Sequence, residues 1–386
     1  MRRIVCDIEC TTSNKGNPFD RRNILVVVGI RDIDSKEVFL FYYPTKEDVK
    51  QIQDILSNCL FIAHNAKFDL HWIKKIGVDF STIKVWCTQL GEFVLSNQKL
   101  KFPSLEDASV RYNLGHKIDV IKNDFWDKGI DTNDIPQQIL SEYLEQDLYL
   151  TEQLYLKQRG LFEKEHASKY NLFKLHCQDL IVLEEMEYNG ILFDVENALK
   201  MAEGIQKEQD ALYKKMVSIL GNVPFNLNSG DHLSAIFYGG DIVVESHIPV
   251  GVFKTGKKIG ETRYKIIEKK YTMPRLVEPL AKTEAKKPIG SPPVWFTNDD
   301  VLRSLKHTKE SRKIMTLVSK YSELEKLRGT YLVGWSNMIK EMNWEENTIH
   351  GQLNQSTVVT GRLSSSKPNL QNADSITKTF CVSRYA

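Results

Sequence analysis

The chain has 386 residues, of which 41% are hydrophobic and 26% charged, and its formal net charge is +2. This length allows two or three globular domains, and the small net charge means that any polyanion site must come from local clusters of basic residues. No apolar run approaches the roughly 18 residues of a membrane helix, and the six cysteines have no metal-binding spacing, so we expect a cytoplasmic protein with reduced thiols and no membrane partner.

The first predicted element is a short strand, Arg3–Glu9, that ends in two carboxylates. Side chains alternate between the faces of a strand, so Asp7 and Glu9 should point one way while Cys6 and Ile8 point into the core. Two neighbouring acids repel each other and need a counter-charge, which a divalent cation such as Mg²⁺ or Mn²⁺ often supplies. Taken alone, such a pair is more often a solvated strand end, so further acids are needed to support a metal site.

Residues 1–157 are predicted to form one α/β domain with a mixed sheet. Further strands are predicted at Asn23–Arg31, Glu37–Tyr43, Cys59–Ala63 and Ile83–Cys87. A helix capped by Thr45 is predicted through Leu56, and further helices are predicted from Ala66 to Ile76, after the Ser104–Asp107 capping box, and from Pro136 to Arg159.

Two more acids accompany these helices. Asp69 is expected in the first turn after Asn65, where the helix dipole favours an anion. Asp147 follows Tyr143 by four residues on the last helix, so the two side chains share a face. Considered alone, each acid is best interpreted as an ordinary helix residue without a catalytic role. Leucines of the last helix can face the sheet instead: Leu140, Leu144, Leu148 and Leu154.

Four acids, one asparagine and one tyrosine occur in a fixed order: Asp7, Glu9, Asn65, Asp69, Tyr143 and Asp147. This order resembles the tyrosine-bearing branch of the DEDD exonuclease superfamily over essentially all of residues 1–157. The resemblance implies a ribonuclease H-like fold whose four acids hold two divalent metal ions, Mg²⁺ or Mn²⁺. It also implies that Tyr143 helps to position the attacking water and that Asn65 binds substrate.

The chemistry of the acids is consistent with this resemblance. Two cations about 4 Å apart can stabilise both the attacking and the departing oxygen when a phosphodiester is hydrolysed. His64 has no spaced histidine partner and is expected to be structural. Cys87 stands where relatives often have an aspartate, outside the four acids, so only a changed local contact is expected there.

Residues 158–347 are predicted to be mostly helical. The predicted helices are Tyr170–Tyr188, Ala198–Leu220, a short helix opened by Phe225–Ser229 and continuing through Tyr238, Asn298–Ser304 and Ser311–Trp335. Three strings, Met186–Ile191, Phe225–Ser229 and Glu325–Tyr331, resemble the thumb of family A DNA polymerases, the bacterial polymerase I type and its phage relatives.

Residues 239–296 depart from the compact form of such a thumb and are rich in Gly, Lys and Pro. Between Lys254 and Pro288 there are eleven Lys or Arg and four Glu. Ile242–Val244 and Tyr264–Ile267 are predicted strands of an extended hairpin. Three interpretations stay open: an arm that neutralises duplex phosphates, a solvated insertion, or, as in some phage relatives, a binding site for a host processivity protein.

The string Thr360–Asn372 resembles the family A polymerase motif at the entrance of the palm. The resemblance implies that Arg362, Asn369 and Gln371 contact the minor groove near the primer end, where the acceptor atoms are nearly independent of sequence. Residues 348–386 are therefore expected to begin the palm. The aspartate-bearing palm motifs and the fingers helix are not in the sequence, so we expect that this polypeptide alone does not polymerise.

The expected architecture is thus an α/β ribonuclease H-like exonuclease domain followed by a mostly α-helical polymerase thumb and the start of the palm. The function it implies is 3′–5′ proofreading, with a single-stranded DNA 3′ end at the nuclease site and primer-template duplex at the thumb and palm entrance. The alternative is a non-catalytic, DNA-binding half of a split polymerase whose palm and fingers come from a second polypeptide. An RNA-trimming exonuclease shares the four acids, but the thumb and palm strings argue against it.

Overall fold

A computed structural model describes residues 1–118, 120–256, 258–280, 284–285 and 294–383. It divides into two compact units: a first unit of Met1–Val195 with Trp335–Ala386, and a second unit of Glu196–Gly334. The domains expected from the sequence were residues 1–157, 158–347 and 348–386. The two compact units of the structure have different boundaries from these domains. The first unit extends past residue 157 because Phe173, Cys177 and Leu180 belong to the same hydrophobic core as the N-terminal strands.

The first unit is built on a five-stranded mixed sheet with the order β3-β2-β1-β4-β5. The strands are β1 (Arg3–Cys10), β2 (Leu25–Asp32), β3 (Val38–Tyr42), β4 (Leu60–Ala63) and β5 (Lys84–Cys87). β1 pairs antiparallel with β2 and parallel with β4, so the strand that carries the first two acids is central. The predicted strands of this region are therefore confirmed, with ends that differ by one or two residues.

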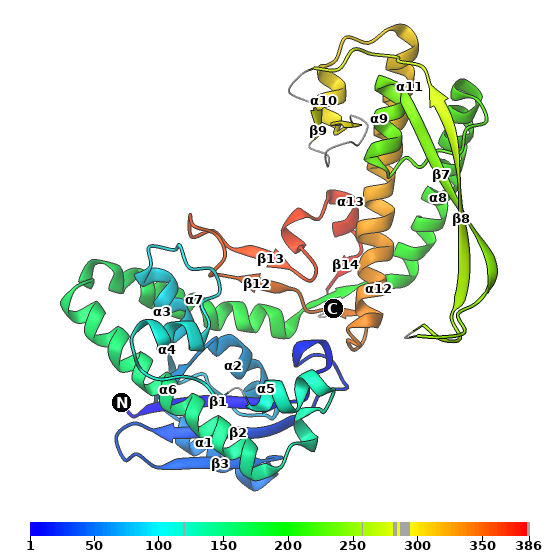
Figure 1. Ribbon diagram of the computed structural model, residues 1–386. Helices are drawn as coiled ribbons and strands as arrows, with labels where there is room; N and C mark the ends of the chain where they lie inside the picture. The colour runs from blue at the N-terminus through cyan, green and yellow to red at the C-terminus, as the bar shows by residue number, and fades with distance from the viewer. Residues whose placement is uncertain (119, 257, 281–283, 286–293, 384–386) are drawn as a thin grey trace. The chain divides into compact units, whose positions relative to one another are not determined.

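Helices surround this sheet (Figure 1). They are α1 (Lys46–Leu56), α2 (Ala66–Lys75), α3 (Thr88–Leu95), α4 (Leu105–Arg111), α5 (Val120–Asp124), α6 (Gln137–Lys164) and α7 (Ala167–Asn189), with short 3₁₀ turns η1 (Ser13–Lys15), η2 (Trp126–Lys128) and η3 (Thr132–Asp134). The predicted caps are present: Thr45 and Asp48 form a reciprocal capping box at α1, and the Ser104 side chain accepts a hydrogen bond from the Asp107 amide at α4. Pro136 is the residue before α6 rather than its first residue.

The long helix α6 packs across β1 and β2. A side chain at Gly29 of β2 would meet Leu144 at 2.8 Å and Leu148 at 3.1 Å, so the absence of a Cβ at this position lets the helix approach the sheet closely. Leu140, Leu144 and Leu148 belong to the core of the sheet, as predicted. Leu154 does not, because it packs with Leu105 and Ala108 of α4 in a separate small cluster.

The C-terminal segment of the chain joins the first unit through small sheets. These sheets combine β6 (Ile191–Phe193), which follows α7, with the C-terminal elements β11 (Thr348–Ile349), β12 (Gln352–Asn354), β13 (Ser364–Ser366), η6 (Leu370–Asn372), α13 (Ser375–Lys378) and β14 (Cys381–Val382). β6 lies between β11 and β14, both antiparallel to it, and β12 pairs with β13. Phe193 packs near the rings of Trp335 and Phe380. Strand β6 was missed in the sequence because it has only three residues.

The second unit combines helices with a long two-stranded ribbon. Its elements are α8 (Val195–Leu220), α9 (Gly230–Tyr238), β7 (Gly240–Val252), β8 (Thr262–Met273), β9 (Glu284–Ala285), β10 (Val294–Trp295), α10 (Asp299–Ser304), α11 (Lys309–Glu325) and the π-helical turn η5 (Lys326–Leu332), with α12 (Val333–Glu341) crossing the boundary between the units. Its core gathers side chains of α8, α9, α10 and α11 with the base of the ribbon.

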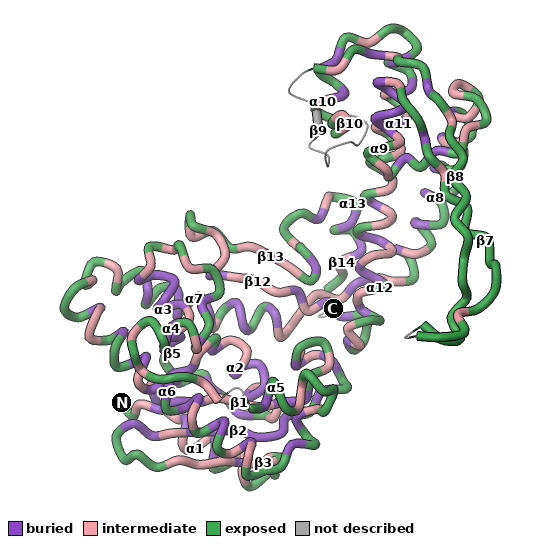
Figure 2. Tube along the Cα trace, viewed as in Figure 1, coloured by how far each residue is buried: buried purple, intermediate pink, exposed green. Residues whose placement is uncertain are grey.

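Two predictions for this unit need correction. The single helix expected over Ser311–Trp335 is α11, a π-helical turn and α12 in succession, and it continues to Glu341. The hairpin strands are far longer than expected, and the two predicted segments are not each other's partners: Ile242 pairs with Tyr271, while Ile266 pairs with His247. The ribbon is buried only at its base and exposed beyond it (Figure 2).

Among the described residues, no helix is both long enough and apolar enough to cross a membrane.

Candidate metal centre

Asp7 and Glu9 lie near the end of β1, past the point where it pairs with β4. The parallel pairing covers Arg3–Val5, so the part of β1 that carries the acids is not paired on that side. Cys6 and Ile8 are buried in the core while both acids are only half-buried. The alternation of the strand therefore places the two carboxylates on one side, as the sequence suggested.

Helix α6 brings Asp147 to the same place. One carboxylate oxygen from each of Asp7, Glu9 and Asp147 lies within 4.8 Å of the other two. Asp147 is only 2% exposed. Tyr143, one turn earlier on the same helix, is also buried. Three acids that are up to 140 positions apart in the sequence thus form one cluster, which we call the acid cluster.

Asp69 enters from helix α2. It sits in the first turn, after Asn65, whose backbone is left-handed with φ of 63°, and its side chain is 2% exposed. Its oxygens are not among those within 4.8 Å of one another. Its carboxylate is nevertheless close enough to Asp7 and Glu9 for their charges to raise its pKa, so it borders the acid cluster.

Burial makes all four acids harder to ionise, and repulsion from neighbouring site acids adds to this for Asp7, Glu9 and Asp69. Burial and the charge of Asp147 raise the pKa of Asp7 to about 7. Burial followed by the charge of Asp7 raises the pKa of Glu9 and of Asp69 well above their usual values. Burial also raises the pKa of Asp147, although its neighbours oppose this. Such an arrangement is stable only when positive charge is available nearby.

The donor set suits a hard divalent cation. The ligands are carboxylate oxygens, the type that Mg²⁺ and Mn²⁺ prefer. Asp147 Oδ1 is buried and has no hydrogen-bond partner among the described residues, so one oxygen of the cluster is left for a ligand. Asp7, Glu9 and Asp147, with Asp69 beside them, therefore fit the expected metal site.

Lys117 was missed by the sequence analysis. It lies in the segment between α4 and α5, and its ammonium group forms an ion pair with Asp147 Oδ2. The same Nζ atom is 5.1 Å from the centroid of the Tyr143 ring. Burial disfavours the charged amine, but Asp147, Tyr143 and Asp7 outweigh burial and raise the pKa of Lys117 above its usual value. No periodicity or motif in the sequence marks this residue.

Asn65 immediately precedes α2, the helix that carries Asp69, and is not part of the acid cluster. It lines a cavity of about 520 Å³ in the first unit, together with Phe68, Phe102 and polar side chains of the β12–β13 segment. Those polar residues are Gln352, Asn354, Thr357, Ser364, Ser366 and Lys367. The cavity therefore connects the beginning of α2 with the segment that resembles the palm entrance.

Arg362, Asn369 and Gln371 are all exposed. Arg362 precedes β13, and Asn369 caps η6 by accepting a hydrogen bond from the Gln371 amide. The Gln371 side chain donates a hydrogen bond to the carbonyl of Leu363 at 3.3 Å. These three residues thus lie on one exposed surface segment, and none of them belongs to the acid cluster.

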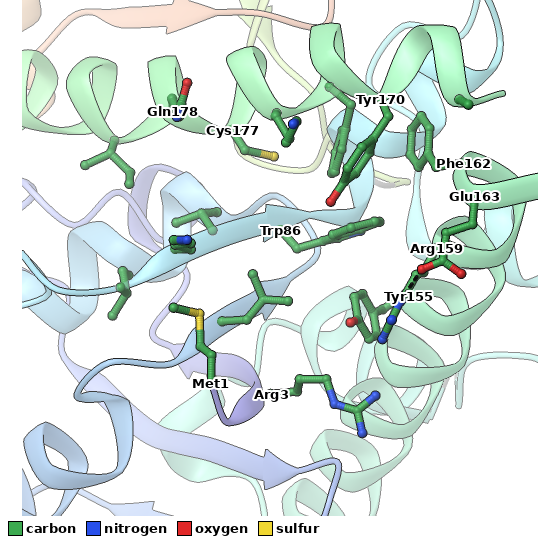
Figure 3. A pocket seen from close by; sticks show the side chains of 18 residues that line it. Met1, Arg3, Trp86, Tyr155, Arg159, Phe162, Glu163, Tyr170, Cys177 and Gln178 are labelled. Carbon is green, nitrogen blue, oxygen red and sulfur yellow. Dashed lines mark hydrogen bonds and ion pairs between the residues drawn. The ribbon is translucent and has the colours of Figure 1, made fainter.

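A second cavity, of about 730 Å³, lies at the beginning of the strands, whereas Asp7 and Glu9 lie near the other end of β1. Trp86, Tyr155, Phe162 and Tyr170 line it, and Arg159 at its edge pairs with Glu163 (Figure 3). The Trp86 ring already packs against Tyr155 at 5.0 Å, so the walls are part of the core. None of the site residues predicted from the sequence lines this cavity.

Comparison with known proteins supports the polymerase resemblance. Residues 274–381 match the family described as DNA polymerase family A. DNA polymerase I of Bacillus subtilis (strain 168) is 25% identical over 317 residues, which cover 81% of this chain and 29% of that polymerase. The DNA polymerase of Bacillus phage SP01 is 26% identical over 321 residues, covering 81% of this chain and 34% of that protein. The predicted similarity to family A DNA polymerases is thereby confirmed.

A solved structure shares the fold. The POL domain of Pol1 from M. smegmatis, in complex with DNA primer-template and dNTP, superposes with a TM-score of 0.64 at 16% sequence identity. The match covers 98% of this chain and 54% of that one. The chain therefore spans about half of the solved domain, and less than a third of the length of the B. subtilis polymerase.

Proposed function

We propose that the first unit is a metal-dependent 3′–5′ exonuclease that proofreads DNA, joined to the primer-template-binding thumb of a family A DNA polymerase. The observation that carries this proposal is the convergence of Asp7, Glu9 and Asp147 within 4.8 Å, with buried Asp69 beside them. The mixed sheet with the acids on its central strand and on α6 supports a ribonuclease H-like domain.

The acids and Tyr143 would have different roles in phosphodiester hydrolysis. Two Mg²⁺ or Mn²⁺ ions, when bound, stabilise the charge on the attacking and departing oxygens. Asp7, Glu9, Asp69 and Asp147 would hold these ions. Tyr143, which is buried in the core one turn from Asp147 on α6, would orient a water molecule toward the scissile phosphate.

The cavity that Asn65 lines is suited to binding the 3′ end of single-stranded DNA. Phe68 and Phe102 offer aromatic surfaces on which bases can stack, a mode of binding that tolerates any sequence. Asn65 can hydrogen-bond to the sugar or the base edge, and Lys15 and Lys367 supply positive charge for phosphates. A proofreading nuclease needs this combination, because it must accept all four bases.

The first prediction concerns Asp7. Replacing Asp7 with alanine removes a ligand from the centre of the acid cluster, so digestion of a 5′-labelled single-stranded oligonucleotide in Mg²⁺ should fall by at least about 10³-fold, a loss typical of disrupted metal catalysis. Asp54→Ala is the matched control, since Asp54 is an exposed carboxylate on α1. It should digest DNA at the wild-type rate.

Full digestion by Asp7→Ala would overturn the nuclease assignment. Faster digestion of RNA than of DNA by the wild-type protein would favour the RNA-trimming alternative instead.

A second function, binding of duplex primer-template, is favoured by the family A match over residues 274–381, which includes Arg362, Asn369 and Gln371. Their exposed side chains could contact minor-groove acceptors. In the non-catalytic alternative this binding is the main role, and a second polypeptide supplies palm and fingers. That alternative requires a wild-type protein that binds duplex but digests no 3′ end.

A further inference from the structure

A lysine side chain, Lys117, supplies a positive charge to the acid cluster. The Lys117 ammonium is paired with Asp147 Oδ2, and its charge also acts on Asp7 and Glu9. Two elements that carry acids therefore converge on an amine supplied by a third segment. The Lys117 ammonium thus contacts a carboxylate oxygen of Asp147, a residue proposed to bind the metal ions.

The backbone of Lys117 is anchored independently of its ammonium. Its amide donates a hydrogen bond to Glu106 Oε2 at 2.6 Å, and the carbonyl of His116 accepts one from Gln146 Nε2 at 3.1 Å. These bonds tie the segment to α4 and α6. The side chain is 24% exposed and has four rotatable bonds, so the ammonium can leave Asp147 for solvent while the backbone stays in place.

Charge balance favours such a movement when metal binds. Four carboxylates carry four negative charges, which two divalent cations neutralise completely. The ammonium would then be a surplus positive charge next to the ions, and like charges at this distance repel. Without metal, the same ammonium offsets part of the repulsion among the acids.

We propose that Lys117 is an exchangeable counter-ion of the nuclease site, which occupies Asp147 in the metal-free protein and is displaced when a divalent cation binds. This inference rests on the proposed function for the identity of the site. It makes Lys117 a positioning residue that keeps α6 and β1 together before metal arrives, at the expense of metal affinity.

Competition predicts the sign of a mutational effect. In Lys117→Met the metal has no amine to displace, so Mn²⁺ should bind the full-length protein about tenfold more tightly by calorimetry, within the range usual for coupled ligands. The variant should also unfold at a lower temperature without metal and gain more from added Mn²⁺. Lys117→Arg keeps the charge and should bind Mn²⁺ as weakly as the wild type.

Lys122→Met is the matched control, because Lys122 is an exposed lysine on the neighbouring helix α5. Its Mn²⁺ affinity should not change. A merely structural role for Lys117 predicts the opposite sign, since a loosened site binds metal less well. Unchanged or weaker Mn²⁺ binding by a folded Lys117→Met protein would overturn the inference.

A measurement on the wild-type protein covers the case in which Lys117→Met fails to fold. Labelling with an amine-directed acetylating reagent, read by mass spectrometry, should modify Lys117 several-fold faster when Mn²⁺ is present, while Lys122 is labelled equally in both conditions. Equal labelling of Lys117 with and without Mn²⁺ would contradict displacement. Either result is independent of DNA digestion, so failure of the nuclease proposal and failure of this inference are distinguishable.

Discussion

His64 shows at the residue level how a histidine beside a candidate active site can be purely structural. Its Nε2 atom donates a hydrogen bond to the carbonyl of Pro103 at 2.9 Å, and Nδ1 faces the hydroxyl of Thr88 at 2.9 Å. The ring thus links the end of β4 to the start of α3 and to the segment before α4. This agrees with the expectation from the sequence that His64 is not a catalytic group.

The environment of His64 predicts a pH effect on stability. Burial lowers its pKa to about 4, so between about pH 6.5 and pH 4 the unfolded chain binds a proton there that the folded chain does not. Stability from this group is therefore complete above about pH 6.5 and is lost as the pH falls. We expect a loss of about 2 kcal/mol by about pH 4, less than a fully buried ring would give because this one keeps some solvent contact.

Urea unfolding of the wild type and of His64→Gln at about pH 7 and about pH 4.5 measures this effect. The free energy of unfolding should fall less in the variant on acidification. The four acids of the candidate site also titrate, with raised pKa values and the opposite sign, but they are common to both proteins and cancel in the difference. Identical pH dependence of the two proteins would mean that folding does not lower the pKa of His64.

At the element level, the candidate site depends on how closely α6 approaches the sheet. Gly29 of β2 is the register partner of Asp7 on β1, so its missing side chain leaves space on the face that carries the acid. Leu144 fills that space, as the 2.8 Å distance to a hypothetical Cβ shows. Asp147 lies one turn from Leu144 on the same helix, so this close approach allows its carboxylate to reach Asp7.

Gly29→Ala should therefore push α6 away from the sheet. We expect a loss of about 1–3 kcal/mol in the free energy of unfolding, as for other overpacked cores, together with weaker Mn²⁺ binding as Asp147 moves from Asp7. Chemical unfolding and calorimetry measure the two effects.

Gly160→Ala provides the control on the same helix, because nothing lies within 4 Å of its hypothetical Cβ. It should raise stability by about 0.5–1 kcal/mol through helix propensity and leave Mn²⁺ binding unchanged. If Gly29→Ala bound Mn²⁺ normally, the approach of α6 would not control the site.

At the scale of the whole molecule, the β7–β8 ribbon of the second unit stands out because so little of it is buried (Figure 2). Ile242 and Met273 anchor its base in the core. Beyond the Val244–Lys269 pair the residues of both strands are exposed, including apolar ones such as Ile248 and Ile266. The insertion of residues 239–296 thus contains a long exposed ribbon that contributes little to the hydrophobic core.

Replacing residues 245–268 with a short turn removes five Lys or Arg and three Glu. The melting temperature should hardly change, because the described residues of this part are almost all exposed. If the ribbon binds duplex phosphates, the slope of log affinity for primer-template against log salt should fall by about 0.9 for each phosphate that the shortened protein no longer neutralises, as measured by fluorescence anisotropy. We expect this decrease, and an unchanged slope would leave only a solvated insertion or a protein-binding arm.

The sequence alone determined the features that depend on near neighbours. The placement of Asp7 and Glu9 opposite Cys6 and Ile8 follows from strand alternation, and the caps at Thr45, Ser104 and Asn298 involve residues three positions apart. The similarity to family A DNA polymerases could also be recognised from the sequence, because it rests on contiguous sequence motifs. Short elements such as α5 and β6 were missed because a few residues carry too little periodicity to indicate their conformation.

Only the tertiary structure decided which distant residues meet. It brought Lys117 to Asp147, turned Leu154 toward α4 rather than the sheet, and made Gly29 the place where α6 approaches β2. These outcomes depend on the summed packing of many side chains far apart in the chain, so no single stretch of sequence encodes them. The acids were recognisable in order along the chain, but the lysine that pairs with Asp147 was recognisable only in the folded structure.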